Sequence, residues 1–165
     1  MADQVILMNH GQVEQVATPR KMYETPATLF AAKFIGTPPM VMFSPKILGN
    51  NLTPEIMSKS QNLTFGIRPE SLVPSETGMI NGEITNIEYL GADAMLECMV
   101  GSETLLCRAS GQTQVLAGAN INLAFDVRDL HVFDSASGRR TDSVLHEIEM
   151  ALSSQTASSK LANQT

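Results

Sequence analysis

The chain has 165 residues and a net charge of −6, from 17 acidic and 11 basic side chains. This length allows one domain, alone or with an attached fragment, and a core that needs no metal or disulfide for support. Acidic side chains outnumber basic ones, and the aromatic content is 5% without tryptophan. Both features argue against binding of nucleic acids or anionic lipids. No apolar run has the length of a membrane span.

The first 36 residues have the pattern of a hairpin followed by two helices. Asn9-His10-Gly11 supplies turn-forming residues between two apolar, β-branched segments. Thr18 and Thr25 each precede a proline, and a threonine cap with proline at the first helical position favours a helix start. Phe30 and Phe34 share one face of the second helix and should be buried together. The expected strands span 4–8 and 12–16, and the expected helices span 19–24 and 26–35.

The motif Gly66-Ile67-Arg68-Pro69-Glu70 marks the entry into the main domain. Apolar and polar residues alternate up to Ile67, as in a half-buried strand. Proline keeps the preceding Arg68 extended, and because Pro69 has no N–H to donate, the strand must lie at an edge or end there. Short segments separated by glycines follow, which is typical of a small β-barrel or sandwich. Strands are expected within 42–48 and over 63–68, 78–90, 94–100, 103–109, 120–125 and 130–133.

Both cysteines fall in one expected hairpin, with Gly101-Ser102 at its tip. In that register Cys98 faces Leu105 and lies diagonal to Cys107. The spacing favours two small buried side chains in a reducing compartment. A disulfide is the alternative, although a diagonal pair seldom has the geometry that it needs.

A last helix is expected to begin at Asp142 or Ser143, because an apolar stripe with helical spacing follows. Beyond Ser153 the composition is mainly Ser, Gln, Thr, Ala and Asn, and we expect disorder there. The stripe consists of Val144, Leu145, Ile148, Ala151 and Leu152. The expected units are 1–43, 44–142 and 143–165.

The residue types that carry chemistry do not form a recognisable catalytic or metal site. The three histidines are scattered, without the spacing of metal ligands. Asp126, Asp129 and Asp134 cluster around a strand end, where turn formation is the favoured interpretation, because a cation site would need more converging oxygen ligands. The sequence has no glycine-rich phosphate loop followed by lysine.

Several separate motifs resemble those of ATP-binding-cassette (ABC) import ATPases. Gly66-Ile67-Arg68-Pro69-Glu70 resembles the opening of their regulatory domain, called TOBE (transport-associated, oligonucleotide/oligosaccharide-binding-like). The resemblance covers about residues 1–141 and is nearest to the maltose-transporter type, whose members import sugars, polyols or glycerol phosphate. Motifs similar to the end of the nucleotide-binding domain are Met1-Ala2-Asp3-Gln4-Val5, Thr18-Pro19, Tyr23-Glu24 and Phe34-Ile35-Gly36. Further TOBE-like motifs are Glu88-Tyr89-Leu90-Gly91-Ala92-Asp93, Leu123-Ala124-Phe125-Asp126, Leu130-His131-Val132-Phe133-Asp134 and Ser137-Gly138-Arg139-Arg140.

This resemblance implies a mainly β fold: a small OB-like (TOBE) barrel at 44–142, a hairpin-plus-helices remnant of the ATPase domain at 1–43, and a short C-terminal helix. It also implies a non-catalytic regulatory and dimerisation domain. In the family the Walker A loop, signature motif, Walker B carboxylate and switch histidine lie before the match at Met1. We therefore expect a truncated, C-terminal piece that does not hydrolyse ATP and holds no cofactor, whereas the full-length family uses ATP and magnesium.

The partners that the resemblance implies are a second copy through the barrel, membrane permease subunits reached only through the missing ATPase domain, and a cytosolic regulatory protein, with no nucleic acid. The implied location is cytoplasmic, at the inner membrane in the full complex. The residues carried over as family-motif or regulatory candidates are Arg68, Pro69, Glu70, Gly91, Arg108, Asp126, Arg128 and Asp134.

A second hypothesis is a small-ligand or oxyanion-binding module, because barrel relatives in other importers bind such molecules between paired domains. Arg68, Arg108 and Arg128 would supply the charge. The simpler alternative is surface ion pairing, of Arg68 with Glu70 and of Arg108 with Glu97.

The apolar side chains of the N-terminal remnant pack on the ATPase core in the family. Without that core we expect them to pack on the barrel or on a second chain, since burying one large side chain contributes roughly 1.5–3 kcal/mol. These side chains are Leu7, Met8, Phe30, Phe34 and Ile35.

Overall fold

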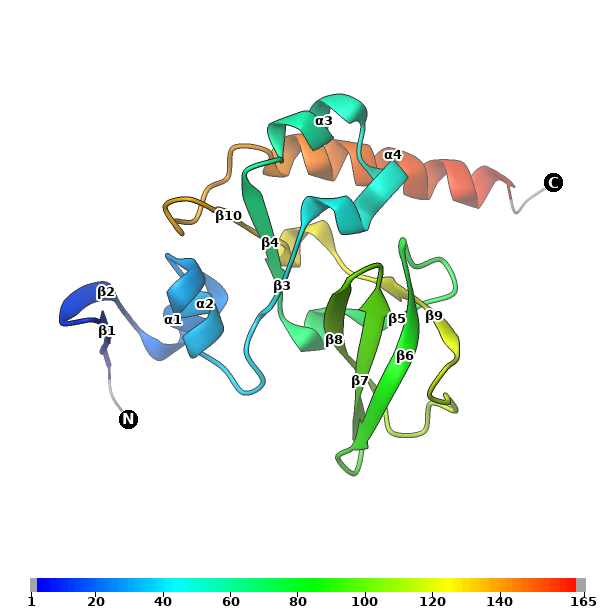
Figure 1. Ribbon diagram of the computed structural model, residues 1–165, viewed down its shortest axis with the longest axis horizontal. Helices are drawn as coiled ribbons and strands as arrows, with labels where there is room; N and C mark the ends of the chain where they lie inside the picture. The colour runs from blue at the N-terminus through cyan, green and yellow to red at the C-terminus, as the bar shows by residue number, and fades with distance from the viewer. Residues whose placement is uncertain (1–2, 163–165) are drawn as a thin grey trace.

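Three parts follow one another across the computed structural model, which describes residues 3–162 (Figure 1). A hairpin and two helices form an N-terminal unit at one end, a three-stranded sheet lies in the centre, and a larger five-stranded sheet lies beyond it. Within the described residues ten strands hold more of the chain than the helices do. The expected mainly β fold is therefore confirmed.

The N-terminal hairpin pairs β1 (Val5–Asn9) with β2 (Gln12–Ala17) in antiparallel register. His10 and Gly11 between them have φ of 47° and 80°, the left-handed conformation that tight hairpin turns require. One face of the hairpin is buried on the helices that follow, and the other is exposed. The exposed side chains are Ile6, Met8, Val13 and Val16.

The first helix begins as expected and the second does not. α1 (Pro19–Glu24) starts at Thr18, whose hydroxyl accepts from the Lys21 amide at 3.2 Å. α2 (Leu29–Phe34) is capped by Thr28, so the expected start at Thr25-Pro26 is wrong. The segment between the helices is held extended instead, because the Ala27 amide donates to Gln15 and Thr28 forms a β-bridge with Arg139.

The apolar side chains of this unit pack mainly with one another, so the expected packing on the barrel is wrong for most of them, and the alternative of packing on a second chain stays a prediction. Leu7 is buried against Met22 and Ala31, with Phe30 and Ile35 at the edge of the cluster. Phe34 stacks on Phe30 with ring centroids 5.6 Å apart but is 65% exposed, and Met8 is exposed too. The expected joint burial fails because α2 turns its alanines inward.

The central sheet has the order β10-β4-β3 and is antiparallel. Its strands are β3 (Val41–Phe43), β4 (Leu63–Ile67) and β10 (His131–Asp134). β4 ends directly before Arg68, and Pro69 opens the short 3₁₀ helix η2 (Pro69–Ser71), as the missing proline N–H predicts. β3 is shorter than its expected range because Pro45 starts another 3₁₀ helix, η1 (Pro45–Asn51).

The five-stranded sheet nearly closes into a barrel. Its strand order is β5-β9-β6-β7-β8, and the Arg108 amide of β8 donates to Leu72, just before β5, at 3.2 Å. The strands are β5 (Val73–Pro74), β6 (Ile80–Tyr89), β7 (Asp93–Val100), β8 (Glu103–Ser110) and β9 (Asn120–Ala124). β5 was not expected, because two residues that end in proline have no strand pattern.

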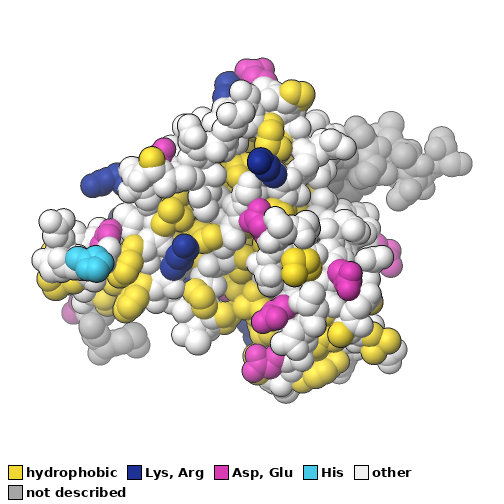
Figure 2. Space-filling model, viewed as in Figure 1, with side chains coloured by type: hydrophobic (Ala, Val, Ile, Leu, Met, Phe, Trp, Pro, Cys, Tyr) yellow, Lys and Arg dark blue, Asp and Glu magenta, His cyan; other side chains and the backbone are white. Residues whose placement is uncertain are grey.

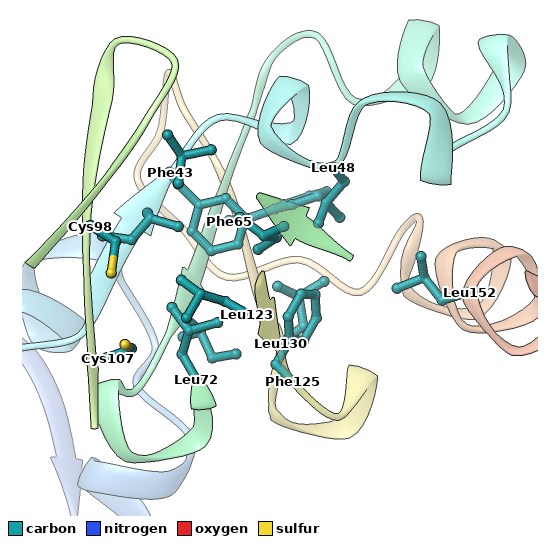
Figure 3. Close-up of a cluster of buried hydrophobic side chains, with 14 of the residues drawn as sticks. Phe43, Leu48, Phe65, Leu72, Cys98, Cys107, Leu123, Phe125, Leu130 and Leu152 are labelled. Atoms are coloured by element: carbon teal, nitrogen blue, oxygen red, sulfur yellow. The ribbon is translucent and has the colours of Figure 1, made fainter. Parts of the chain in front are cut away.

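One hydrophobic cluster fills the barrel and continues under the central sheet (Figure 3). Phe43 and Phe65 meet edge to face at 5.9 Å. Cys98 faces Leu105 and lies diagonal to Cys107, as expected, and both thiols are free and buried. The hydrogen bond to Cys98 and burial both raise the pKa of the Cys107 thiol, which keeps it protonated.

The C-terminal helix α4 (Leu145–Ala162) packs against η1 and against η3 (Val127–Asp129). Val144, Ile148 and Leu152 are buried, which confirms the expected apolar stripe. Lys59, the last residue of α3 (Pro54–Lys59), reaches Glu147 at 2.9 Å.

α4 extends to Ala162, whereas the disorder expected after residue 153 falls mostly on residues whose side chains lie outside the described ones and stays a prediction. Within residues 3–162, the helices lack the combination of length and apolar content needed to cross a membrane.

Candidate functional site

Arg68 connects the barrel side of the molecule to both N-terminal helices. It follows β4 directly and is only 4% exposed. Its Nη1 donates to the Ile35 carbonyl at 2.6 Å and to the Ala32 carbonyl at 3.4 Å, and its Nη2 donates to the Tyr23 carbonyl at 2.9 Å. Tyr23 and Ala32 lie in the last turns of α1 and α2, and Ile35 is the C-cap of α2. Unsatisfied oxygens and the helix dipole favour a cation at such helix ends.

The side chain of Tyr23 also contacts Arg68 and links it to Glu70. The Arg68 guanidinium carbon lies 3.9 Å from the centroid of the Tyr23 ring, a cation–π distance, and the Tyr23 hydroxyl donates to Glu70. Burial, followed by the Glu70 bond, raises the pKa of Tyr23. Burial lowers the pKa of Arg68, which the nearby Tyr23 and Glu70 oppose. The ion pair expected between Arg68 and Glu70 is not formed among the described residues, because Tyr23 contacts both groups instead.

Gly36 makes room for the Arg68 guanidinium. Its φ is +108°, which side-chain-bearing residues rarely adopt, and a Cβ at this position would lie 2.8 Å from Arg68 Nη1. The glycine therefore serves both the backbone turn after α2 and the close approach of the arginine. One Arg68 nitrogen, Nε, remains without a hydrogen-bond partner in this buried position.

Arg108, on the outer face of the barrel, pairs with Asp93 and not with the expected Glu97. Met95 stands opposite Arg108 in the β7–β8 register, so both acids lie one diagonal step from the arginine. The negative charge of Glu70 also attracts the Arg108 guanidinium, and this favours the side-chain orientation of Arg108 that points towards Asp93. The side chains of Arg68, Glu70 and Arg108 thus gather around the junction between the N-terminal unit and the barrel.

A cleft of about 420 Å³ opens at this junction. Its polar side chains are Tyr23, Thr37, Glu70, Asp93 and Arg108, and its apolar ones are Pro38, Pro69, Leu90 and Met95. Gly91, another candidate from the sequence, follows Leu90 in the β6–β7 turn with a φ of 82°.

The remaining candidates do not line this cleft. Arg128 donates through its backbone amide and its Nε to Asp126 at 2.9 and 3.0 Å, and these bonds lower the pKa of Asp126 to about 2. Asp134 accepts from the Ser137 amide at 2.7 Å, which lowers its pKa and fixes a turn. The three arginines of the oxyanion hypothesis therefore do not converge.

The sequence places His131 in an expected strand but gives no sign of its contact with Arg140, next to the junction. His131 is 8% exposed, and its Nδ1 lies 2.7 Å from Arg140 Nη1. Burial, followed by the charges of Arg140 and Arg68, lowers the pKa of His131 to about 4. Because the arginine can only donate, the histidine is neutral and accepts this bond.

Tyr23 and Asp93 are part of the motifs found in the sequence, but the motifs do not predict what these residues contact. Tyr23 became a candidate only through its contact with Arg68, and Asp93 through its bond to Arg108. Within the described part of the chain, no three His, Cys, Asp or Glu residues are grouped so as to hold a metal ion.

Comparison with known proteins gives the class of the barrel. Residues 65–133 match the TOBE domain family, so the chain contains a TOBE domain. The chain is also similar to sn-glycerol-3-phosphate import ATP-binding proteins (UgpC), and the resemblance to the C-terminal part of ABC import ATPases of the sugar and glycerol-phosphate type is confirmed.

Two of these relatives illustrate the coverage. The protein of Paracoccus denitrificans is 37% identical over 153 residues, which include 86% of this chain and 43% of the relative. The protein of Psychromonas ingrahamii is 32% identical over 159 residues, with the same shares of each chain. The chain thus spans less than half the length of the curated relatives that it matches.

Proposed function

We propose that this chain is the regulatory and dimerisation part of an ABC import ATPase subunit for carbohydrates, polyols or glycerol phosphate, and that it is not itself catalytic. Residues 1–43 would be the end of the ATPase domain, 44–142 the regulatory domain and 143–165 an appended helix. The partners would be a second copy, membrane permease subunits reached through the ATPase domain, and a cytosolic regulator. The chain itself would lie on the cytoplasmic face of the membrane.

The observation that carries this proposal is the position of Arg68. A regulatory domain acts on an ATPase domain only if its position is coupled to the element that joins them. Arg68 supplies such a coupling, since one buried side chain of the barrel side bonds the ends of both helices of the N-terminal unit. Three charge-assisted bonds, each worth about 1.5–3 kcal/mol, would resist separation of the two parts.

Hydrogen exchange tests the coupling. In an Arg68→Met variant, the amides of α1 and α2 should exchange faster, while those of β6 and β7 keep their protection, because the ends of both helices lose their charged donor. Arg128→Met is the matched control, since this exposed arginine forms its ion pair with its neighbour Asp126 and not with the N-terminal helices. Unchanged protection of both helices in Arg68→Met would contradict the coupling.

Dimerisation is tested by sedimentation velocity over a range of concentrations. A pair that stays associated would keep two ATPase domains at a high effective concentration through their cycle. A contact of micromolar affinity would be saturated at about 100 µM, so a strictly monomeric chain at that concentration would refute the dimerisation role.

The proposal includes that this chain does not hydrolyse ATP by itself. Phosphoryl transfer needs a phosphate-binding loop with lysine, a metal carboxylate and a positioned water, and the sequence supplies no such loop. Purified chain with ATP and magnesium should release no phosphate above a buffer control, and sustained turnover would contradict this.

Nucleic acid is not proposed as a partner either. On the face shown in Figure 2, the charged side chains visible over the barrel are mainly acidic, which opposes binding to a phosphate backbone.

A further inference from the structure

The junction cleft has the charge balance of a site for an uncharged ligand. Glu70 and Asp93 contribute two negative charges, and Arg108 contributes a positive charge at the same walls. Arg68 adds a second positive charge directly behind the Tyr23 ring. An anion would meet both carboxylates and a cation would meet both guanidinium groups, so neither is favoured by the net field.

The three charged groups that line the cleft, Glu70, Asp93 and Arg108, keep some hydrogen-bonding capacity. One Glu70 oxygen accepts from Tyr23 and one Asp93 oxygen accepts from Arg108, and the second oxygen of each acid has no protein donor among the described residues. Arg108 uses one of its five N–H groups in that pair. The cleft can therefore accept from two ligand hydroxyls and donate to another ligand oxygen.

The other walls of the cleft are apolar. Met95 projects from the outer face of the barrel and yet is only 8% exposed, and Leu90 and Pro38 stand beside it. The volume of about 420 Å³ lies within the range of about 300–1,000 Å³ that is usual for small-molecule sites. An apolar surface of this kind suits the C–H faces of a molecule whose edges carry hydroxyl groups.

We infer that the junction cleft binds a neutral polyhydroxylated small molecule, whose hydroxyls bond Glu70, Asp93 and Arg108 while its C–H face lies on Met95. Such a ligand would contact the N-terminal unit through the Glu70–Tyr23 pair and the barrel through the Asp93–Arg108 pair. It would therefore stabilise the present arrangement of the two parts. This inference does not depend on dimerisation, because a monomeric chain has the same cleft.

The test uses chain labelled with ¹³C at the methionine methyl groups. The Met95 signal is assigned with Met95→Leu, and Met150, which is exposed on α4, serves as the internal reference. The probes are myo-inositol, D-glucose and maltose, each titrated to about 50 mM so that millimolar affinity is detected. Sodium sulfate and spermidine are the charged comparison probes.

A saturable shift of Met95, with Met150 unchanged, is the expected result for at least one of the three neutral probes. Asp93→Asn and Glu70→Gln should each weaken that binding about tenfold, while Asp126→Asn, which alters a similar Asp–Arg pair outside the cleft, should leave it unchanged. Two separate acid variants are used so that misfolding of one, visible in its methionine spectrum, does not decide the test.

Three outcomes would overturn the inference. The first is a Met95 signal that stays fixed with all neutral probes. The second is a stronger response to sulfate or spermidine than to the neutral probes. The third is equal binding by the wild type and both acid variants. The two experiments are independent. A negative ligand titration says nothing about dimerisation, and a monomeric chain in sedimentation says nothing about ligand binding.

Discussion

Acidification should destabilise the folded chain through a single buried histidine. His131 on β10 accepts a hydrogen bond from Arg140 in a position that is 8% exposed. Protonation would remove the acceptor and add a positive charge beside Arg140 and Arg68, the two cations that already act on the ring. The expected result is a loss of stability under mildly acidic conditions, before most carboxylates are protonated.

The size of this loss follows from the two pKa values of His131. Burial and the two arginines lower its pKa from 6.5 to about 4 on folding. The folded state therefore binds the proton more weakly than the unfolded chain, so the stabilisation is complete above pH 6.5 and is lost as the pH falls towards 4. At about 1.36 kcal/mol per pKa unit, the loss approaches about 3 kcal/mol below pH 4 and is about 2 kcal/mol at pH 5.

Urea unfolding at pH 7.5 and pH 5 measures this loss. Between these conditions the wild type should lose about 2 kcal/mol more than His131→Gln, because glutamine can accept from Arg140 and does not titrate. The control is His10→Gln in the exposed hairpin turn, which should keep the wild-type dependence. The reasoning is refuted if wild type and His131→Gln lose the same free energy between the two pH values.

Two substitutions and one labelling experiment test the packing. Gly36→Ala should destabilise the chain by about 1–3 kcal/mol in urea unfolding, because it strains a backbone with positive φ and crowds Arg68; an unchanged midpoint would contradict the geometry. Ile148→Ala should cost about 2–5 kcal/mol if α4 unfolds with the main core, whereas a loss under 1 kcal/mol would mean that α4 detaches independently. The buried Cys98 and Cys107 should react with a thiol reagent only as fast as the chain unfolds, and immediate labelling in native buffer would show that one of them is accessible.

The fold could be predicted where no contact with a distant segment overrides the local sequence pattern. The alternation before Arg68 and the proline after it set both the position and the end of β4, and the strand spacing gave the hairpin that places Cys98 and Cys107 on one face. The second helix shows the limit of such signals. Thr25-Pro26 has the same local pattern as Thr18-Pro19, but bonds from Gln15 and a bridge to Arg139 hold that segment extended.

The candidate site could be predicted only in part, because its contacts join distant segments. The motif singled out Arg68 and the proline fixed its extended backbone, yet the tyrosine whose carbonyl it bonds lies 45 residues away. The simpler alternative, surface ion pairing, predicts Glu70 as the partner of Arg68 because the two residues are close in sequence. A ring stacked on the guanidinium cannot be inferred from spacing, and so Tyr23 was missed.

The two attachments of α2 determine how the N-terminal unit can move. At its start, the Leu29 amide donates to Gly138 at 2.8 Å and the Arg140 amide donates to Ala27 at 2.9 Å. At its end, Arg68 bonds the last-turn carbonyls. Both attachments originate at the central sheet, one after β10 and one after β4, and these strands are hydrogen-bonded neighbours. Because α2 is held at both ends by adjacent strands, we expect it to move with the central sheet and not to swing about a single hinge.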